Sequence, residues 1–202
     1  LVFRCEDHDM EPFTLALLLE KIQSDDPLIR TDAWQKAGSI GPPALIPLAI
    51  LAAEAELEIA RAARRGMWQI VHTAGAPGAE DSRPAVIKEL LDLLGGNRPA
   101  SVRRDILWMI SELGCGKCAA APVAAFLQDE ALREDARCSL ERMPGEESVA
   151  ALQAALETVP REFQLAIAHS LRVRGVEVSL EKYPCQKLVP TKKTAVKRAG
   201  AA

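Results

Sequence analysis

The chain has 202 residues, of which 49% are hydrophobic, 26% charged and only 4% aromatic. This length suits one domain with a sizeable core, and the apolar content excludes a wholly disordered chain. The abundance of Ala and Leu disfavours a β-sandwich or barrel, and no apolar run is long enough to span a membrane.

Ten helices are predicted, arranged as five consecutive pairs. Proline stands in the first turn of several of them, where its missing N–H costs nothing, and polar turn residues separate the members of most pairs. In chain order the predicted pairs are 13–23 with 29–41, 42–54 with 63–75, 83–95 with 102–114, 121–129 with 132–144, and 148–159 with 163–175.

The second helices of these pairs share one internal repeat. Their starts lie 34, 39, 30 and 31 residues apart, and most end at a glycine. Apolar residues recur at positions 1, 5, 9 and 12, which fall within about 80° of one another around a helix and predict a single buried stripe. One helix pair cannot bury such a stripe alone, so the repeat predicts an all-α stack of neighbouring pairs with a continuous core.

The repeat resembles the HEAT repeat, and especially the short HEAT-like repeats found in phycobilin lyases. The matching residues are an arginine at position 2, an aspartate at position 4 and a closing apolar-Gly pair: Arg30, Arg64, Arg103, Arg133; Asp32, Asp105, Asp135; Ile40-Gly41, Leu113-Gly114. Unit two departs with Gly66 and unit five with Gln164 and Ala166. The resemblance implies a right-handed α-solenoid of about five antiparallel pairs, an Arg–Asp ladder between repeats, and a concave face lined by the second helices.

Positions 3, 7 and 10 of the second helices point away from the buried stripe, toward the expected groove. Trp108 stands out there, since an aromatic flanked by arginines is typical of an interface anchor. The alternative is that Trp108 leans on a neighbouring helix, whereas Trp34 and Trp68 are predicted to pack beside the core. The predicted partner-binding residues are Arg65, Gln69, His72, Arg104, Trp108, Glu134, Glu141, His169 and Arg172.

No catalytic constellation, cofactor motif or metal-ligand spacing is recognisable in the sequence. The one small chemical motif is Cys115-Gly-Lys-Cys118, whose thiols have the spacing of a redox pair or of half a zinc site. The alternative is a turn in which the cysteines act as compact apolar residues. We expect no metal or cofactor, with Cys115 and Cys118 as a weak candidate pair.

The charge distribution divides the chain. The net charge of −3 combines a balance of −7 over residues 1–175 with +4 over 176–202, and the acidic body disfavours broad nucleic-acid binding. We expect an N-terminal extension (1–11), a repeat domain (12–175) and a basic, extended tail (176–202). Residues 176–180 are predicted either to form a short strand or to let the tail cover the open end of unit five.

The repeat and the lack of catalytic motifs predict a non-catalytic module that binds another protein or peptide in its groove. One alternative, implied by the resemblance, is a chromophore-handling enzyme similar to phycobilin lyases, using Glu134, Glu141 and His169. Another is nucleic-acid contact through the tail residues Lys192, Lys193, Lys197 and Arg198. A cytoplasmic location is the default expectation, although the chain begins with Leu1 rather than Met and a removed leader stays open.

Overall fold

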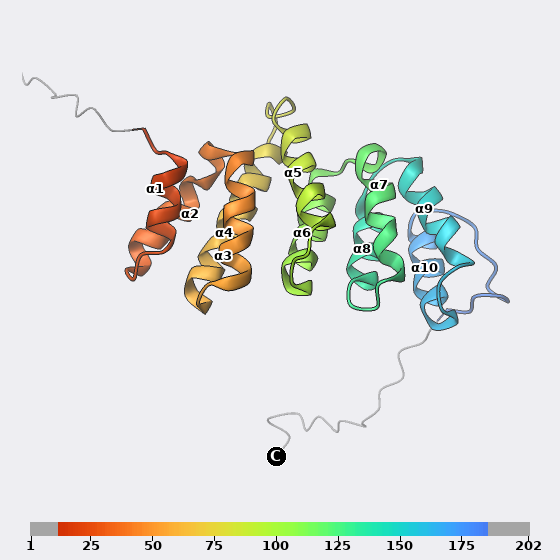
Figure 1. Ribbon diagram of the computed structural model, residues 1–202. Coiled ribbons are helices and arrows are strands. Elements are labelled where there is room, and N and C mark those ends of the chain that lie inside the picture. Colours follow the sequence, from red (N-terminus) through yellow and green to blue (C-terminus); the bar gives the residue numbers. More distant parts are fainter. Residues whose placement is uncertain (1–11, 186–202) are drawn as a thin grey trace, which may run out of the picture.

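The computed structural model describes residues 12–185 (Figure 1). This part of the chain contains ten α-helices, two short 3₁₀ helices and no strand, which confirms the all-α prediction. The elements are α1 (Leu15–Ile22), α2 (Pro27–Ile40), η1 (Pro42–Ala44), α3 (Leu45–Glu54), α4 (Leu57–Gly75), α5 (Arg83–Gly95), α6 (Ala100–Leu113), α7 (Gly116–Ala124), η2 (Ala125–Gln128), α8 (Arg133–Arg142), α9 (Glu146–Leu156) and α10 (Arg161–Val173).

Local sequence signals set the starts of the first two helices. The Thr14 and Asp26 side chains accept backbone N–H groups at the starts of α1 and α2, and Pro27 occupies the first position of α2. Two starts were predicted more than two residues too late. The helix α4 begins at Leu57 rather than 63, because 57–62 contains no helix breaker, and α7 begins at Gly116, within the turn predicted around the two cysteines.

The helices form two layers, as Figure 1 shows. The even-numbered helices contact one another in chain order, α3, α5, α7 and α9 do the same, and each odd-numbered helix packs on the next even-numbered one. The core lies between the layers. This arrangement is consistent with the expected α-solenoid.

The predicted apolar stripe is buried in units two to four. In α4, for example, Ala63, Met67, Val71 and Ala74 are all at most 2% exposed. The prediction is wrong for Ile29 at the start of α2, whose side chain is 41% exposed. The reason is position: α2 is the first even-numbered helix, so within the described chain no earlier helix of that layer packs beside it.

Two glycines let α2 and α4 approach closely. A Cβ on Gly66 would lie 3.2 Å from Leu48 Cδ1 and 3.5 Å from Ala37 Cβ, and a Cβ on Gly38 would meet Thr73 Oγ1 at 2.1 Å. Gly66 is the residue at which unit two departs from the repeat's aspartate. The departure therefore has a packing reason, because an aspartate side chain has no room there.

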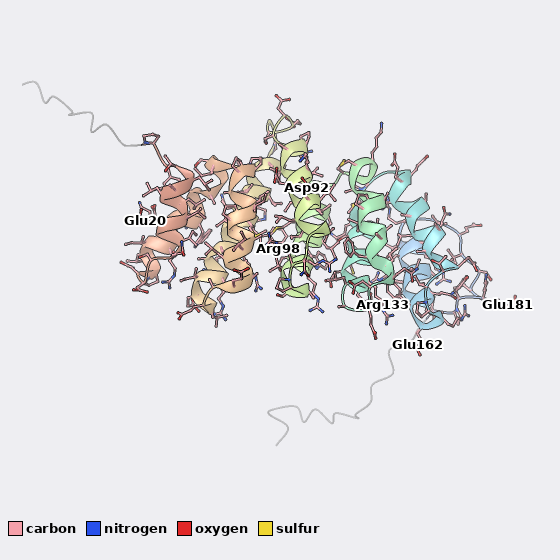
Figure 2. All side chains as sticks on the ribbon, viewed as in Figure 1. Glu20, Asp92, Arg98, Arg133, Glu162 and Glu181 are labelled. Atoms are coloured by element: carbon pink, nitrogen blue, oxygen red, sulfur yellow. A yellow bond between two sulfur atoms is a disulfide. The ribbon has the colours of Figure 1, made fainter. Side chains whose placement is uncertain are left out.

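Residues 176–185 fold back on the last helix pair instead of extending away. Figure 2 shows Glu162 of α10 and Glu181 at the same end of the molecule. The Tyr183 ring is buried, its hydroxyl donates to Glu157 Oε1 at 3.1 Å, and Arg172 donates to the Tyr183 carbonyl. Of the two alternatives for this segment, the covering of unit five is confirmed for these residues, and the strand over 176–180 does not form.

Candidate interaction face

The predicted groove residues lie at the surface of the even-numbered helices. None of the nine is buried. Five are exposed, namely Arg65, His72, Arg104, Glu134 and His169, and four are half-buried, namely Gln69, Trp108, Glu141 and Arg172. The prediction that these positions face away from the core therefore holds. The side chains differ in how many contacts they already make with other residues.

Trp108 is engaged by the next unit. Its indole N–H donates to Asp135 Oδ1 at 2.9 Å, and the Arg142 guanidinium lies over its ring, 5.2 Å from the centroid. Asp135 also pairs with Arg104 at 3.4 Å. Trp108 thus leans on α8, as the second interpretation of the sequence had it, while its service as a partner anchor stays a prediction.

The Arg–Asp ladder forms in only one place with the expected partners. Arg64 Nε lies 3.2 Å from Asp105 Oδ2, joining α4 to α6. One unit later, Arg103 turns instead to Asp129, at 3.8 Å, and covers the Phe126 ring. Arg104 pairs with Asp135 in place of Arg103, because Arg104 and Trp108 reach that carboxylate from the same surface of α6.

Burial gives Asp105 a perturbed titration. Removal from water raises the pKa of the Asp105 carboxyl, the Arg64 guanidinium lowers it, and the nearby Asp135 carboxylate raises it further. The first and third effects outweigh the ion pair, so the pKa lies above its ordinary value. The rung between α4 and α6 is therefore a positioning contact with little net electrostatic stabilisation.

Arg137 links units four and five, and sequence reasoning missed it. Its guanidinium pairs with Glu134 at 2.8 Å and Glu141 at 3.1 Å, and donates to Ser170 Oγ at 2.6 Å. Only 15% of the side chain is exposed. The i−3 and i+4 spacing of the two glutamates was the available signal. The contact to Ser170 replaces the ladder rung that Ala166 removes from unit five.

A cavity of about 370 Å³ lies between α8, α10 and the end of the folded-back segment. It is lined by Arg137, Leu165, Ala166, His169, Arg172, Pro184 and Cys185. Its two arginines are already engaged: Arg137 by the two glutamates, and Arg172 by backbone carbonyls of residues 178, 179 and 183. Of the predicted residues, the structure brings His169 and Arg172 together here.

A second cluster lies on α2 and α4. Arg65 covers the half-buried Trp34 ring at 5.7 Å, and one turn further along α4 the Trp68 and His72 rings lie 5.6 Å apart. Both tryptophans pack against the core, as predicted. A small hollow beside Arg65 and Trp34 is also lined by Arg30 and Arg61. Within residues 12–185, Arg65 forms no ion pair, whereas Arg61 pairs with Glu58 at 2.7 Å.

Cys115 and Cys118 form a disulfide at the start of α7. In the described part of the chain no group of three or more His, Cys, Asp or Glu side chains is placed to hold a metal ion. Nor does any helix there have the length and apolarity to cross a membrane. The tail residues Lys192, Lys193, Lys197 and Arg198 lie outside the described residues.

No protein-family model matches the chain, and no curated protein matches it.

Proposed function

We propose that this chain is a non-catalytic interaction module, a right-handed HEAT-like α-solenoid that binds a protein or peptide on a concave face formed by its even-numbered helices. The five-fold recurrence of the helix pair and the two-layer packing support this architecture. The outward-facing polar row on the even-numbered helices supports the choice of face.

The observation that carries the proposal is Arg65 on α4. Its guanidinium is exposed, forms no ion pair within residues 12–185, and lies on the Trp34 ring. An arginine held on an aromatic keeps its outer N–H donors free for a carboxylate, while the ring beneath limits its side-chain motion. Arginine and tryptophan are also the residues that most often dominate binding energy at interfaces.

Charge indicates the partner's chemistry. Arg30, Arg61 and Arg65 line the hollow between α2 and the start of α4, and among residues 12–185 Glu58 is the one acidic side chain that lines it. Arg30 also donates to the Ser24 and Asp25 carbonyls and Arg61 pairs with Glu58, so Arg65 is the arginine left for a partner. The exposed Leu28 and Leu57 stand at these same helix starts. The fitting partner is therefore a peptide segment with an acidic residue next to apolar ones.

The test is charge reversal at Arg65. The whole chain is used as bait in affinity purification from an extract of its native source, and the amount of bound partner is measured. We expect Arg65→Glu to lower that amount by at least tenfold. Lys88→Glu on α5, in the other layer, makes the same charge change and should leave recovery unaltered. Equal recovery with Arg65→Glu and the unaltered chain would refute this site, provided both variants unfold at the same urea concentration as the original.

The two alternatives receive no comparable support. Glu134 and Glu141, the acids proposed for chromophore handling, both pair with Arg137, so the single guanidinium offsets part of their charge. The lysines and arginine proposed to contact nucleic acid lie outside the described residues.

A further inference from the structure

The pair Cys115 and Cys118 has no part in the proposed interaction face, yet its setting is chemically distinctive. Cys115 lies in the connection between α6 and α7 and Cys118 in the first turn of α7, where unit three gives way to unit four (Figure 1). Cys115 is the residue that caps α7, and the two cysteines are joined by a disulfide with their Cα atoms 5.7 Å apart. A disulfide closing so short a loop adds little to the stability of the fold, since the entropy it removes grows with loop length.

The environment stabilises a thiolate on Cys115. The backbone N–H of Cys118 points at Cys115 Sγ, 3.3 Å away, as in a capping hydrogen bond. The first turn of the nine-residue helix α7 contains no acidic side chain, and Lys117 stands between the two cysteines. A helix N-terminus with a neighbouring cation is the setting that lowers the pKa of cysteine thiols in proteins.

The two sulfurs differ in access. Cys118 is exposed, whereas Cys115 is half-buried and packs against the core. The turn between them is held from below: a Cβ on Gly116 would lie 2.0 Å from the Pro144 carbonyl oxygen, so the backbone of α7 rests directly on the connection that follows α8. This support fixes Cys115 beneath the surface and presents Cys118 outward.

From this geometry we propose that Cys115 and Cys118 form a redox-active couple that exchanges electrons with an external dithiol. A thiolate of the dithiol attacks the exposed Cys118 sulfur, the intramolecular S–S bond breaks, and Cys115 leaves as the stabilised thiolate. The second thiolate of the dithiol then attacks the dithiol sulfur that is bonded to Cys118, and the Cys118 thiolate is released. The dithiol is oxidised to a disulfide, the protein pair gains two electrons, and the two cysteine thiolates take up protons from water.

This activity is separate from partner binding on the even-numbered helices. It requires only the α6–α7 connection and the first turn of α7, whereas the hollow beside Arg65 is lined by residues of α2 and α4. The whole chain would therefore combine a binding face with a site that oxidises a dithiol or, in its reduced form, reduces a disulfide.

The first experiment is a redox titration of the whole chain in which Cys5, Cys138 and Cys185 are replaced by serine, so that only the pair reports. The protein is equilibrated with mixtures of reduced and oxidised dithiothreitol, alkylated, and weighed by mass spectrometry. We expect one transition in which both thiols become alkylated together, reversible in either direction. A pair that stays wholly reduced or wholly oxidised across all mixtures would overturn the proposal.

The second experiment tests the assigned roles with an aromatic disulfide probe, 5,5′-dithiobis(2-nitrobenzoate). Measured at a pH where both thiols are ionised, so that only access differs, the exposed Cys118 thiol in Cys115→Ser, which keeps an oxygen able to cap α7, should react at least tenfold faster than the Cys115 thiol does in Cys118→Ser. Equal or reversed rates would overturn the assignment of Cys118 as the attacked sulfur. Far-ultraviolet circular dichroism of both variants shows that the helices remain intact.

Discussion

The contact between α2 and α4 gives a sharp test of the packing. Gly38 lies inside α2, and a Cβ there would lie 2.1 Å from Thr73 Oγ1, 3.1 Å from Thr73 Cβ and 3.3 Å from the Gln69 carbonyl oxygen. Gly95, in α5, supplies the matched control, because a Cβ there meets no atom within 4 Å. Replacing each glycine by alanine adds the same methyl group in a crowded place and in an open one.

The expected energies have opposite signs. Alanine favours a helix over glycine by up to about 1 kcal/mol at both positions. At Gly38 the methyl group also forces overpacking, at a cost of about 1–3 kcal/mol, and displaces the Thr73 hydroxyl from the Gln69 carbonyl, with which it bonds at 2.8 Å, at a cost of about 1 kcal/mol. Gly38→Ala should therefore destabilise the chain by about 1–3 kcal/mol, whereas Gly95→Ala should stabilise it by up to about 1 kcal/mol.

Urea unfolding followed by circular dichroism measures both free energies. The double variant Gly38→Ala, Thr73→Ala should recover part of the loss, because it removes the clashing hydroxyl, with a coupling of about 1 kcal/mol. Equal stabilisation by Gly38→Ala and Gly95→Ala would refute the close approach of α2 and α4, since no second helix would then meet the added methyl group.

Three further predictions concern contacts elsewhere in the chain. Trp108→Phe should lower the free energy of unfolding by about 1 kcal/mol, because the Asp135 carboxylate loses its indole donor; an unchanged urea midpoint would contradict that bond. Tyr183→Ala should cost about 2 kcal/mol or more by uncovering unit five, and limited proteolysis should then cut within 176–185. The raised pKa of Asp105 means that the folded chain binds this proton more tightly than the unfolded chain. Its contribution to stability is therefore full below the ordinary aspartate pKa and is lost as the pH rises above it, so the unfolding free energy of the original chain relative to Asp105→Asn should fall as the pH is raised from the acid side.

Much of the fold could be predicted because the same pattern of apolar residues recurs in each repeat. A buried stripe at positions 1, 5, 9 and 12 follows from helix geometry alone, and it holds from unit two to unit four. Ile29 breaks it because burial depends on a neighbour as well as on a helical face, and α2 has none on that side.

The candidate site was predictable in its positions and less so in its bonds. Helical phase placed Arg65, Trp108 and His169 at the surface of the even-numbered helices. It could not tell that Asp135 takes the Trp108 indole, or that Arg104 supplants Arg103 on that carboxylate, because several arginines lie within reach of one acid. The contact between Arg65 and the Trp34 ring was missed because the two residues come from different helices.

The sequence by itself determined that this chain is helical, repeated and buried along one stripe, because those properties follow from spacing within single helices. The tertiary structure decided everything that depends on two helices meeting. It paired Arg137 with Ser170 where the ladder aspartate is missing, and it folded residues 176–185 over the open end of unit five. It also packed Gly116 against the Pro144 carbonyl, with Cys118 exposed. Such contacts join residues tens of positions apart, and side-chain reach and packing select among partners that the repeat treats alike.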